Sequence, residues 1–163
     1  MTMIVFSGGQ VLIQEGKAPI LPRTDKLETP EDIARAADQM EFAEMIANWP
    51  IERPISDRKM WLHGKEVGRK EAVKLLNENP EIGTFLVRES QKKEKTLVLS
   101  LYGTQEVEGT FTNRTLHFEI SAIGTHLFMD LGPYMPSLEH LVDHYMTFKD
   151  GLPCRLIRPV HPL

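Results

Sequence analysis

Arg88 and Ser90 are the residues of this chain whose types and spacing point most directly to a chemical role. They follow the apolar segment Phe85-Leu86-Val87, and their two-residue spacing places both side chains on one face of a β-strand. A guanidinium in such a strand is partly desolvated and cannot lose its charge, so it needs an anion. Two interpretations are open. Arg88 pairs with an internal carboxylate or carbonyl group, or it binds a phosphate dianion from another molecule together with Ser90.

The polar run Gln91–Lys95 comes directly after this strand and contains Lys92 and Lys93. A turn at this place brings hydrogen-bond donors and positive charge over the strand end that carries Arg88. Without an arginine beside it, the same run is typical of a solvated surface turn. Both interpretations of the lysines stay open from the residues alone.

Other residues with reactive side chains fit structural roles better. His140 and His144 have the four-residue spacing of zinc hydrolases, but Leu141 stands where those enzymes need a glutamate. We therefore expect no metal site, and nothing in the sequence indicates a cofactor. Cys154 is the single cysteine, which excludes an intrachain disulfide and a zinc site of several cysteines. It has no recognisable base beside it, so we expect a buried structural thiol.

Composition limits the function further. The chain has 163 residues, of which 41% are hydrophobic and 26% charged, as in ordinary soluble globular proteins. A formal net charge of -4, from 19 basic and 23 acidic residues, argues against a general nucleic-acid binder. No apolar run is long enough for membrane insertion. The single cysteine fits a reducing compartment, so we expect a cytoplasmic protein.

The elements that would position these residues form one domain over residues 60–163. Apolar periodicity predicts helices and strands at the following places: helices over 69–77 and 137–148, and strands over 83–88, 96–102, 115–121 and 126–129. The order of a helix, antiparallel strands and a second helix indicates an α+β fold. We expect a central antiparallel sheet with one helix against each face.

Residues 1–59 read as an N-terminal extension and linker. Residues around Ser7–Gln10 have the composition of a hairpin turn, and Thr29 followed by Pro30 is typical of a helix start. Helical spacing of apolar residues predicts an amphipathic helix over about 30–48. Prolines at positions 50 and 54 then predict a linker over about 49–59.

Several short motifs of the second segment occur together in one order and spacing. They are Trp61-Leu-His-Gly64, Arg69 at a helix start, Gly83-Thr-Phe-Leu-Val-Arg88-Glu-Ser90, Leu116-His117-Phe118, Ser137-Leu138, His144-Tyr145 and Asp150-Gly151-Leu152. The ordered set resembles a Src homology 2 domain, the phosphotyrosine-peptide module, over about residues 60–160. The ending Asp150–Pro159 most resembles the domains of cytoplasmic tyrosine kinases of the Csk and Syk types.

The resemblance implies two groups of site residues. Arg88 matches the arginine that holds phosphate by two prongs, Arg69 the helix arginine at the phosphate and tyrosine ring, and His117 the pocket histidine. The phosphotyrosine-binding set that it implies is Arg69, Arg88, Ser90, Lys92, Lys93 and His117. The set implied for a second, apolar pocket, which takes a residue about three positions after the phosphotyrosine, is Phe118, Met129, Tyr145 and Leu152. One position departs from the family: Glu119 stands where Lys or Arg is usual.

The resemblance implies a non-enzymatic binding module that recruits its protein to tyrosine-phosphorylated partners in signalling, as an adaptor does. Two alternatives remain open. The chain is a regulatory fragment of a larger non-receptor tyrosine kinase, or it is a structural domain that has lost phosphotyrosine binding, for which Glu119 is the warning. The kinase loop signatures are absent from these residues, so we expect no enzymatic activity of the chain itself.

Overall fold

The computed structural model describes residues 26–130 and 132–163. They form an α+β structure that divides into two compact units between Glu52 and Arg53. The hairpin expected near residues 7–10 lies outside the described residues. Within the described part of the chain, no helix has the length and apolar character needed to cross a membrane.

In the first unit, the described residues from position 26 onward contain two short helices, α2 (Pro30–Ala36) and α3 (Met40–Ala47). Thr29 caps α2, because its side chain accepts a hydrogen bond from the backbone N–H of Asp32, whose carboxylate accepts one from the backbone N–H of Thr29. The helical region expected over 30–48 is therefore present, but it is broken in two. Asp38 lies at the break with a φ of 57°, which no α-helix accommodates.

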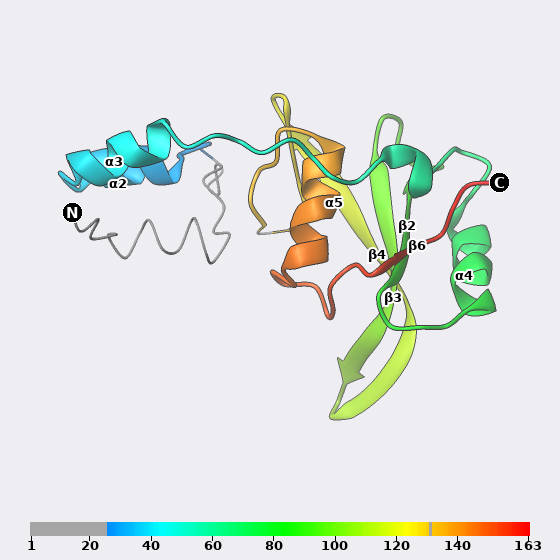
Figure 1. The fold of residues 1–163 in the computed structure, drawn as a ribbon. Coiled ribbons are helices and arrows are strands. Elements are labelled where there is room, and N and C mark those ends of the chain that lie inside the picture. The colour runs from blue at the N-terminus through cyan, green and yellow to red at the C-terminus, as the bar shows by residue number, and fades with distance from the viewer. Residues whose placement is uncertain (1–25, 131) are drawn as a thin grey trace, which may run out of the picture. The chain divides into compact units, whose positions relative to one another are not determined.

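The second unit is built on a sheet of the order β1-β2-β3-β4-β5, with β6 paired to β2 (Figure 1). Its strands are β1 (Leu62–His63), β2 (Thr84–Glu89), β3 (Leu97–Val107), β4 (Thr110–Ile123), β5 (His126–Phe128) and β6 (Arg158–Pro159). The ladders from β2 to β5 are antiparallel, whereas β1 and β6 both run parallel to β2. β2 is apolar on both faces because a helix covers each one.

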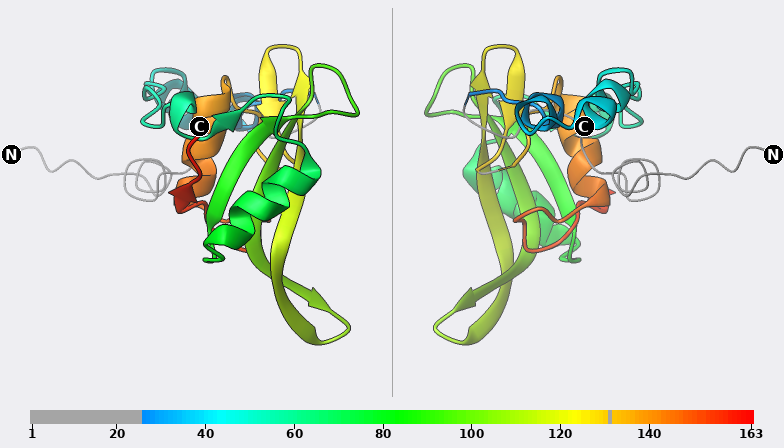
Figure 2. Two further views of the ribbon diagram at one scale, coloured as in Figure 1. Left: turned by 90° about the vertical axis from the view of Figure 1, so that its right-hand side faces the viewer. Right: turned by 90° about the vertical axis from the view of Figure 1, so that its left-hand side faces the viewer.

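Helices α4 (Arg69–Glu78) and α5 (Leu138–Thr147) lie on opposite faces of this sheet (Figures 1 and 2). Ala72 and Leu76 of α4 are fully buried against Leu86 of β2. Ser137 caps α5 as expected, accepting a hydrogen bond from the backbone N–H of His140 at 3.2 Å. Because side chains alternate along a strand, Arg88 shares the α4 face with Leu86.

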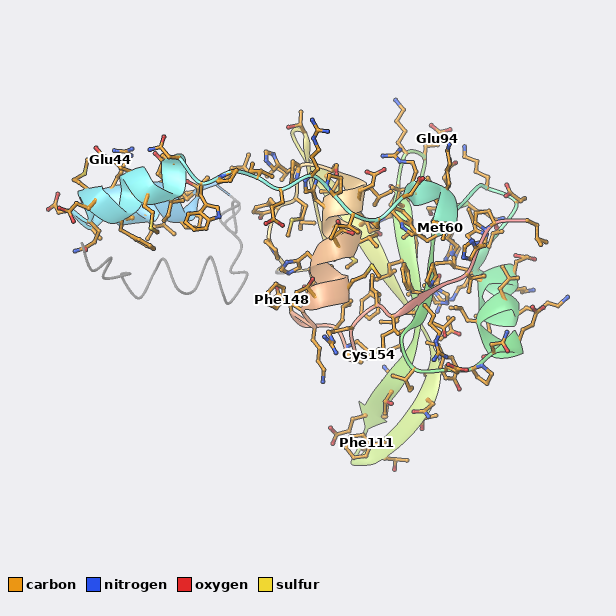
Figure 3. All side chains as sticks on the ribbon, in the orientation of Figure 1. Glu44, Met60, Glu94, Phe111, Phe148 and Cys154 are labelled. Atoms are coloured by element: carbon orange, nitrogen blue, oxygen red, sulfur yellow. The ribbon has the colours of Figure 1, made fainter. Side chains whose placement is uncertain are left out.

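β3 and β4 continue beyond the strands expected from the sequence and form a long hairpin. Its turn is Glu108-Gly109, and both residues have positive φ, 50° and 77°. Phe111 lies near the turn and is 70% exposed. Figure 3 shows it at the end of the sheet opposite to Glu94, which lies in the β2–β3 loop. The hairpin end and the loop end are therefore separate surfaces.

The segment before β1 is fastened to α5. The carboxylate of Asp143 accepts hydrogen bonds from the backbone N–H groups of Ile55, at 2.6 Å, and Ser56, at 3.0 Å. Arg58, in the 3₁₀ helix η1 (Arg58–Met60), donates to Glu139 at 3.0 Å from its terminal nitrogen. The sequence places these residues in the linker before residue 60, whereas the structure attaches them to α5.

Candidate anion-binding site

Three polar side chains lie together on the α4 face of the sheet, one from each of β2, β3 and β4. Ser100 is the strand partner of Leu86 on one side and of His117 on the other, so all three residues share this face with Arg88. Arg88 is 5% exposed and Ser100 is fully buried. The sheet thus carries a buried cation in a row of hydrogen-bonding groups.

The hydrogen bonds in this row have one consistent direction. The Nε–H of Arg88 donates to the Oγ of Ser100 at 3.3 Å, because a guanidinium can only donate. The Ser100 hydroxyl lies 2.8 Å from Nδ1 of His117, and its one hydrogen is available for that nitrogen. Nδ1 then accepts, so the proton of the neutral ring is on Nε2. Arg88 keeps its two terminal nitrogens, and His117 keeps one N–H, as donors for a further group.

Burial and charge both act against the positive charge of Arg88. Burial lowers the pKa of its guanidinium, the charge of Arg69 lowers it further, and Glu71 offsets part of this effect. Among the residues that the structure describes, no carboxylate lies within ion-pair distance of Arg88. Arg69 is the first residue of α4, which brings a second cation to the same site. Two cations without a paired acid form a site suited to an anion.

His117 is held neutral in this environment. Burial lowers the pKa of His117 to about 4, and the charges of Arg69, Arg88 and Arg114 act in the same direction. At neutral pH the ring therefore acts as a hydrogen-bond donor through Nε2 rather than as a third cation.

The β2–β3 loop is organised by Ser90. Its Oγ accepts hydrogen bonds from the backbone N–H groups of Lys92, at 3.3 Å, and Lys93, at 3.1 Å. The Ser90 backbone N–H in turn donates to the carbonyl of Thr96 at 2.8 Å, which closes the loop. A hydroxyl that accepts two hydrogen bonds still has its own hydrogen to donate. The loop thus places two lysines next to the strand end that carries Arg88.

Glu119 of β4 lies on the same sheet face and pairs with this loop. Both of its carboxylate oxygens lie near the Nζ of Lys93, at 2.8 and 3.0 Å. The two side chains are exposed, at 62% for Lys93 and 47% for Glu119. The carboxylate that the sequence identified as a departure is therefore paired with a lysine of the loop.

The residues expected to line an apolar pocket differ in burial. Phe118 points to the α5 face and is half-buried, whereas Met129, Tyr145 and Leu152 are buried. The Tyr145 hydroxyl lies against Gly132, where an added Cβ would lie 2.2 Å from it; the Met129 atom near this position, at 2.9 Å, is the backbone carbonyl oxygen of the local turn. Contact among the members of the set stays a prediction.

The histidines of α5 take part in local hydrogen bonds. Nδ1 of His140 lies 2.6 Å from the Oγ of Ser137, and Nε2 of His144 lies 2.7 Å from a carboxylate oxygen of Asp150. Over residues 26–130 and 132–163, no group of three or more His, Cys, Asp or Glu side chains is arranged to hold a metal ion. Cys154 is buried, and burial raises the pKa of its thiol.

The sequence interpretation did not identify Ser100. A serine inside the apolar run Leu97–Leu101 is the signal that was available, because a buried hydroxyl needs a polar partner. His63 also has a partner, since its Nε2 lies 2.7 Å from the carbonyl oxygen of Val160.

Comparison with known proteins gives consistent results. The family model for the SH2 domain matches residues 61–145. The chain is 35% identical over 162 residues to "Tyrosine-protein kinase Shark" of Drosophila melanogaster, covering 90% of this chain and 17% of that protein. It is 34% identical over 145 residues to "Tyrosine-protein kinase HTK16" of Hydra vulgaris, covering 88% of this chain and 18% of that protein. The chain thus spans less than a fifth of either relative.

A solved structure supports the fold independently. The SH2 domain of the Monosiga brevicollis CRK/CRKL homolog superimposes with a TM-score of 0.52 at 22% identity, covering 71% of this chain and 95% of that domain. The sheet with α4 and α5 on its two faces is thus shared with a protein of low sequence identity. With the match of the family model, these findings show that this chain belongs to the SH2 domain family.

Proposed function

We propose that this chain binds phosphotyrosine peptides through the α4 face of its sheet and thereby recruits its protein to tyrosine-phosphorylated partners. SH2 domains bind such peptides, and the chain belongs to that family. The observation that carries the proposal is the state of Arg88, which is 5% exposed and has no acidic partner among the described residues. A buried charge without a partner is costly, and a phosphate dianion supplies the missing charge.

In this proposal, each residue around the bound phosphate has its own role. Arg88 donates from its two terminal nitrogens, as its Nε is engaged by Ser100. Arg69 adds the second charge from the start of α4 and can stack on the tyrosine ring. His117 donates from Nε2.

The β2–β3 loop completes the proposed phosphate site. Ser90 donates its hydroxyl hydrogen, while Lys92 and Lys93 contribute positive charge from the loop that Ser90 organises. A phosphate group carries a charge of about -1.5 to -2 at neutral pH, so two arginines already balance it.

For peptide specificity, the proposal includes an apolar residue about three positions after the phosphotyrosine. The residues assigned to it are Phe118, Met129, Tyr145 and Leu152. Met129, Tyr145 and Leu152 are buried, which supports an apolar environment for this residue. A phosphopeptide array that varies this position tests the proposal, and equal binding of acidic, polar and apolar residues there would contradict it.

The parent protein is, in this proposal, a non-receptor tyrosine kinase acting in the cytoplasm. The matches to Shark and HTK16 extend over 90% and 88% of this chain, well beyond the part that the SH2 model covers. The matched stretch therefore includes much of the segment before the SH2 domain. The chain acts in such a protein as a binding module, and we assign no phosphoryl transfer to it.

Titration with a matched pair of peptides tests the main proposal. A peptide with phosphotyrosine should bind, and the same peptide with tyrosine should bind at least about 30-fold more weakly, because about 2 kcal/mol or more is lost with the charged partner. Equal affinities for the two peptides would favour the alternative of a structural domain that has lost this activity.

A further inference from the structure

The Lys93–Glu119 ion pair lies at the edge of the candidate phosphate site and brings a negative charge to it. Glu119 is the strand partner of Val98, and Ser100 is the strand partner of His117, so the carboxylate lies two residues along β4 on the face that carries the buried row. Its distances to Lys93 Nζ, 2.8 and 3.0 Å, involve both oxygens. The ion pair therefore joins the β2–β3 loop to β4 beside Arg88.

From this geometry we propose that Glu119 is an affinity-setting residue that withholds Lys93 from the phosphate. This inference rests on the proposed phosphotyrosine binding. Lys93 has one ammonium group with three hydrogens, and two of them are directed to the Glu119 carboxylate oxygens when no ligand is bound. A phosphate must therefore either displace the carboxylate or share the ammonium group with it. In both cases Glu119 lowers the affinity.

The size of this effect follows from the exposure of the two side chains. Both side chains are exposed, and exposed ion pairs contribute little, so the cost of breaking this pair, or of sharing its ammonium, is small. A displaced carboxylate would then face a ligand of the same sign across the β4 edge. The cost at the ion pair and the repulsion between carboxylate and ligand are both small, and both lower the affinity. Their sum corresponds to about two- to fivefold in affinity.

The ion pair couples the effects of Glu119 and Lys93 on ligand affinity. While Glu119 is present, loss of the Lys93 ammonium costs little affinity, because that group is already engaged. Once Glu119 is replaced, the ammonium becomes available to the ligand, and its loss costs more. A purely structural ion pair would predict the opposite: either single substitution would disturb the loop equally and would weaken binding.

The test is a double-mutant cycle of Glu119→Gln and Lys93→Ala, with phenyl phosphate as the probe and phenol as its uncharged control. Binding is followed by the backbone amide signals of the β2–β3 loop in NMR titrations. Glu94→Gln is the matched control, because it removes the same charge from an exposed residue next to Lys93 in the β2–β3 loop. Thermal unfolding of each variant checks that the fold is unchanged.

We expect Glu119→Gln to tighten phenyl phosphate binding by about two- to fivefold, and Glu94→Gln to change it by less than about twofold. Lys93→Ala should weaken binding by less than about twofold in the wild-type background and by at least about threefold in the Glu119→Gln background. Equal effects of Lys93→Ala in both backgrounds, or weaker binding of Glu119→Gln, would overturn the inference.

Arg88→Ala separates this inference from the proposed function. If Arg88→Ala abolishes binding of phenyl phosphate while Glu119→Gln has no effect, the phosphate site stands and only the role of Glu119 is wrong. If Arg88→Ala binds phenyl phosphate as the wild type does, the proposed function itself is wrong, and the inference fails with it.

Discussion

The Nε of Arg88 lies 3.3 Å from the Oγ of Ser100, and this hydrogen bond determines which part of the guanidinium a ligand can reach. A guanidinium has five N–H donors in a flat fork. Since one of them is engaged inside the sheet, the remaining edge carries the two terminal nitrogens. The sheet thus orients the guanidinium so that its two terminal nitrogens can donate together to an oxyanion.

Replacement of Ser100 by alanine tests this orientation. Ser100 is fully buried, so Ser100→Ala leaves the Nε–H of Arg88 without a partner and frees the guanidinium to rotate. We expect affinity for a phosphotyrosine peptide to fall by about tenfold, which corresponds to about 1.4 kcal/mol. Isothermal titration calorimetry measures the change.

The matched control for Ser100 is Thr104, which lies on the same strand. Its hydroxyl donates to Asn113 in the exposed hairpin, away from the candidate site. Thr104→Ala should bind the peptide as the wild type does. Wild-type affinity of Ser100→Ala would show that the Arg88–Ser100 bond has no part in ligand binding.

His117 predicts how stability depends on pH. Its pKa is about 4 in the folded protein against an ordinary value of 6.5, so the unfolded chain takes up a proton first as the pH falls. The contribution of the neutral His117 ring to the free energy of unfolding is present in full above about pH 6.5. It is lost as the pH falls from about 6.5 to 4. Urea unfolding near pH 7 and pH 4.5 should show a loss on the order of 1–2 kcal/mol from this group.

The variant His117→Gln isolates this contribution. It should lose less stability than the wild type between the two pH values, since it has no group to protonate at this place. Replacement of the exposed His161 by glutamine is the control, and it should keep the wild-type pH dependence. An unchanged pH dependence in His117→Gln would contradict the low pKa.

The hydrogen bonds of Asp143 should stabilise the attachment of residues 55–58 to α5. Its carboxylate accepts from two backbone N–H groups, those of Ile55 and Ser56. Asp143→Ala should lower the free energy of unfolding by about 1–2 kcal/mol, while Glu106→Ala in the exposed hairpin should change it by less than about 0.5 kcal/mol. Urea unfolding measures both. An unchanged midpoint in Asp143→Ala would show that the segment is only loosely attached.

A substitution at Gly132 tests how tightly Tyr145 is packed. A methyl group at this position would lie 2.2 Å from the Tyr145 hydroxyl oxygen, so the buried ring or the backbone at residue 132 must move. Gly132→Ala should destabilise the protein by about 1–3 kcal/mol. Gly109→Ala, at a turn with open space around it, is a control for loss of a glycine, although its positive φ alone costs about 1 kcal/mol. Equal melting temperatures of wild type and Gly132→Ala would contradict this packing.

Much of the second unit could be predicted because its signals are local. The apolar run before Arg88 is a strand covered on both faces, and Ser137 begins a helix, as the sequence indicates. The α+β arrangement and the family follow from the order of these motifs. What the sequence could not predict are the two-residue strands β1 and β6, because their pairing with β2 depends on contacts far along the chain.

The hairpin and the N-terminal helices show two further limits. The residues of β3 and β4 beyond Gly103 are largely polar and exposed, so they lack the alternation by which a half-buried strand is recognised. The turn Glu108-Gly109 is not among the strongest hairpin dipeptides. In the N-terminal region, helical spacing continues across Asp38, where the backbone leaves the helix, so the break is not visible in the pattern.

The charged residues of the candidate site could be predicted from the sequence, but the hydrogen bonds and the ion pair that join them could not. Arg88 was predicted from its type and spacing together with the family resemblance, and His117 from the resemblance alone. The link between them runs through Ser100, whose neighbours in space come from strands 12 and 17 residues away. The pairing of Glu119 with Lys93 likewise joins residues 26 positions apart, and no local pattern determines it.

Arg88→Lys tests the central claim most directly, because it keeps the charge and removes the fork. The paired peptides, with phosphotyrosine and with tyrosine, are titrated into wild type and variant by calorimetry. We predict that the phosphorylated peptide loses at least about 30-fold in affinity in Arg88→Lys, so that the preference for phosphate nearly disappears. A variant that still prefers the phosphorylated peptide as strongly as the wild type does would contradict the account.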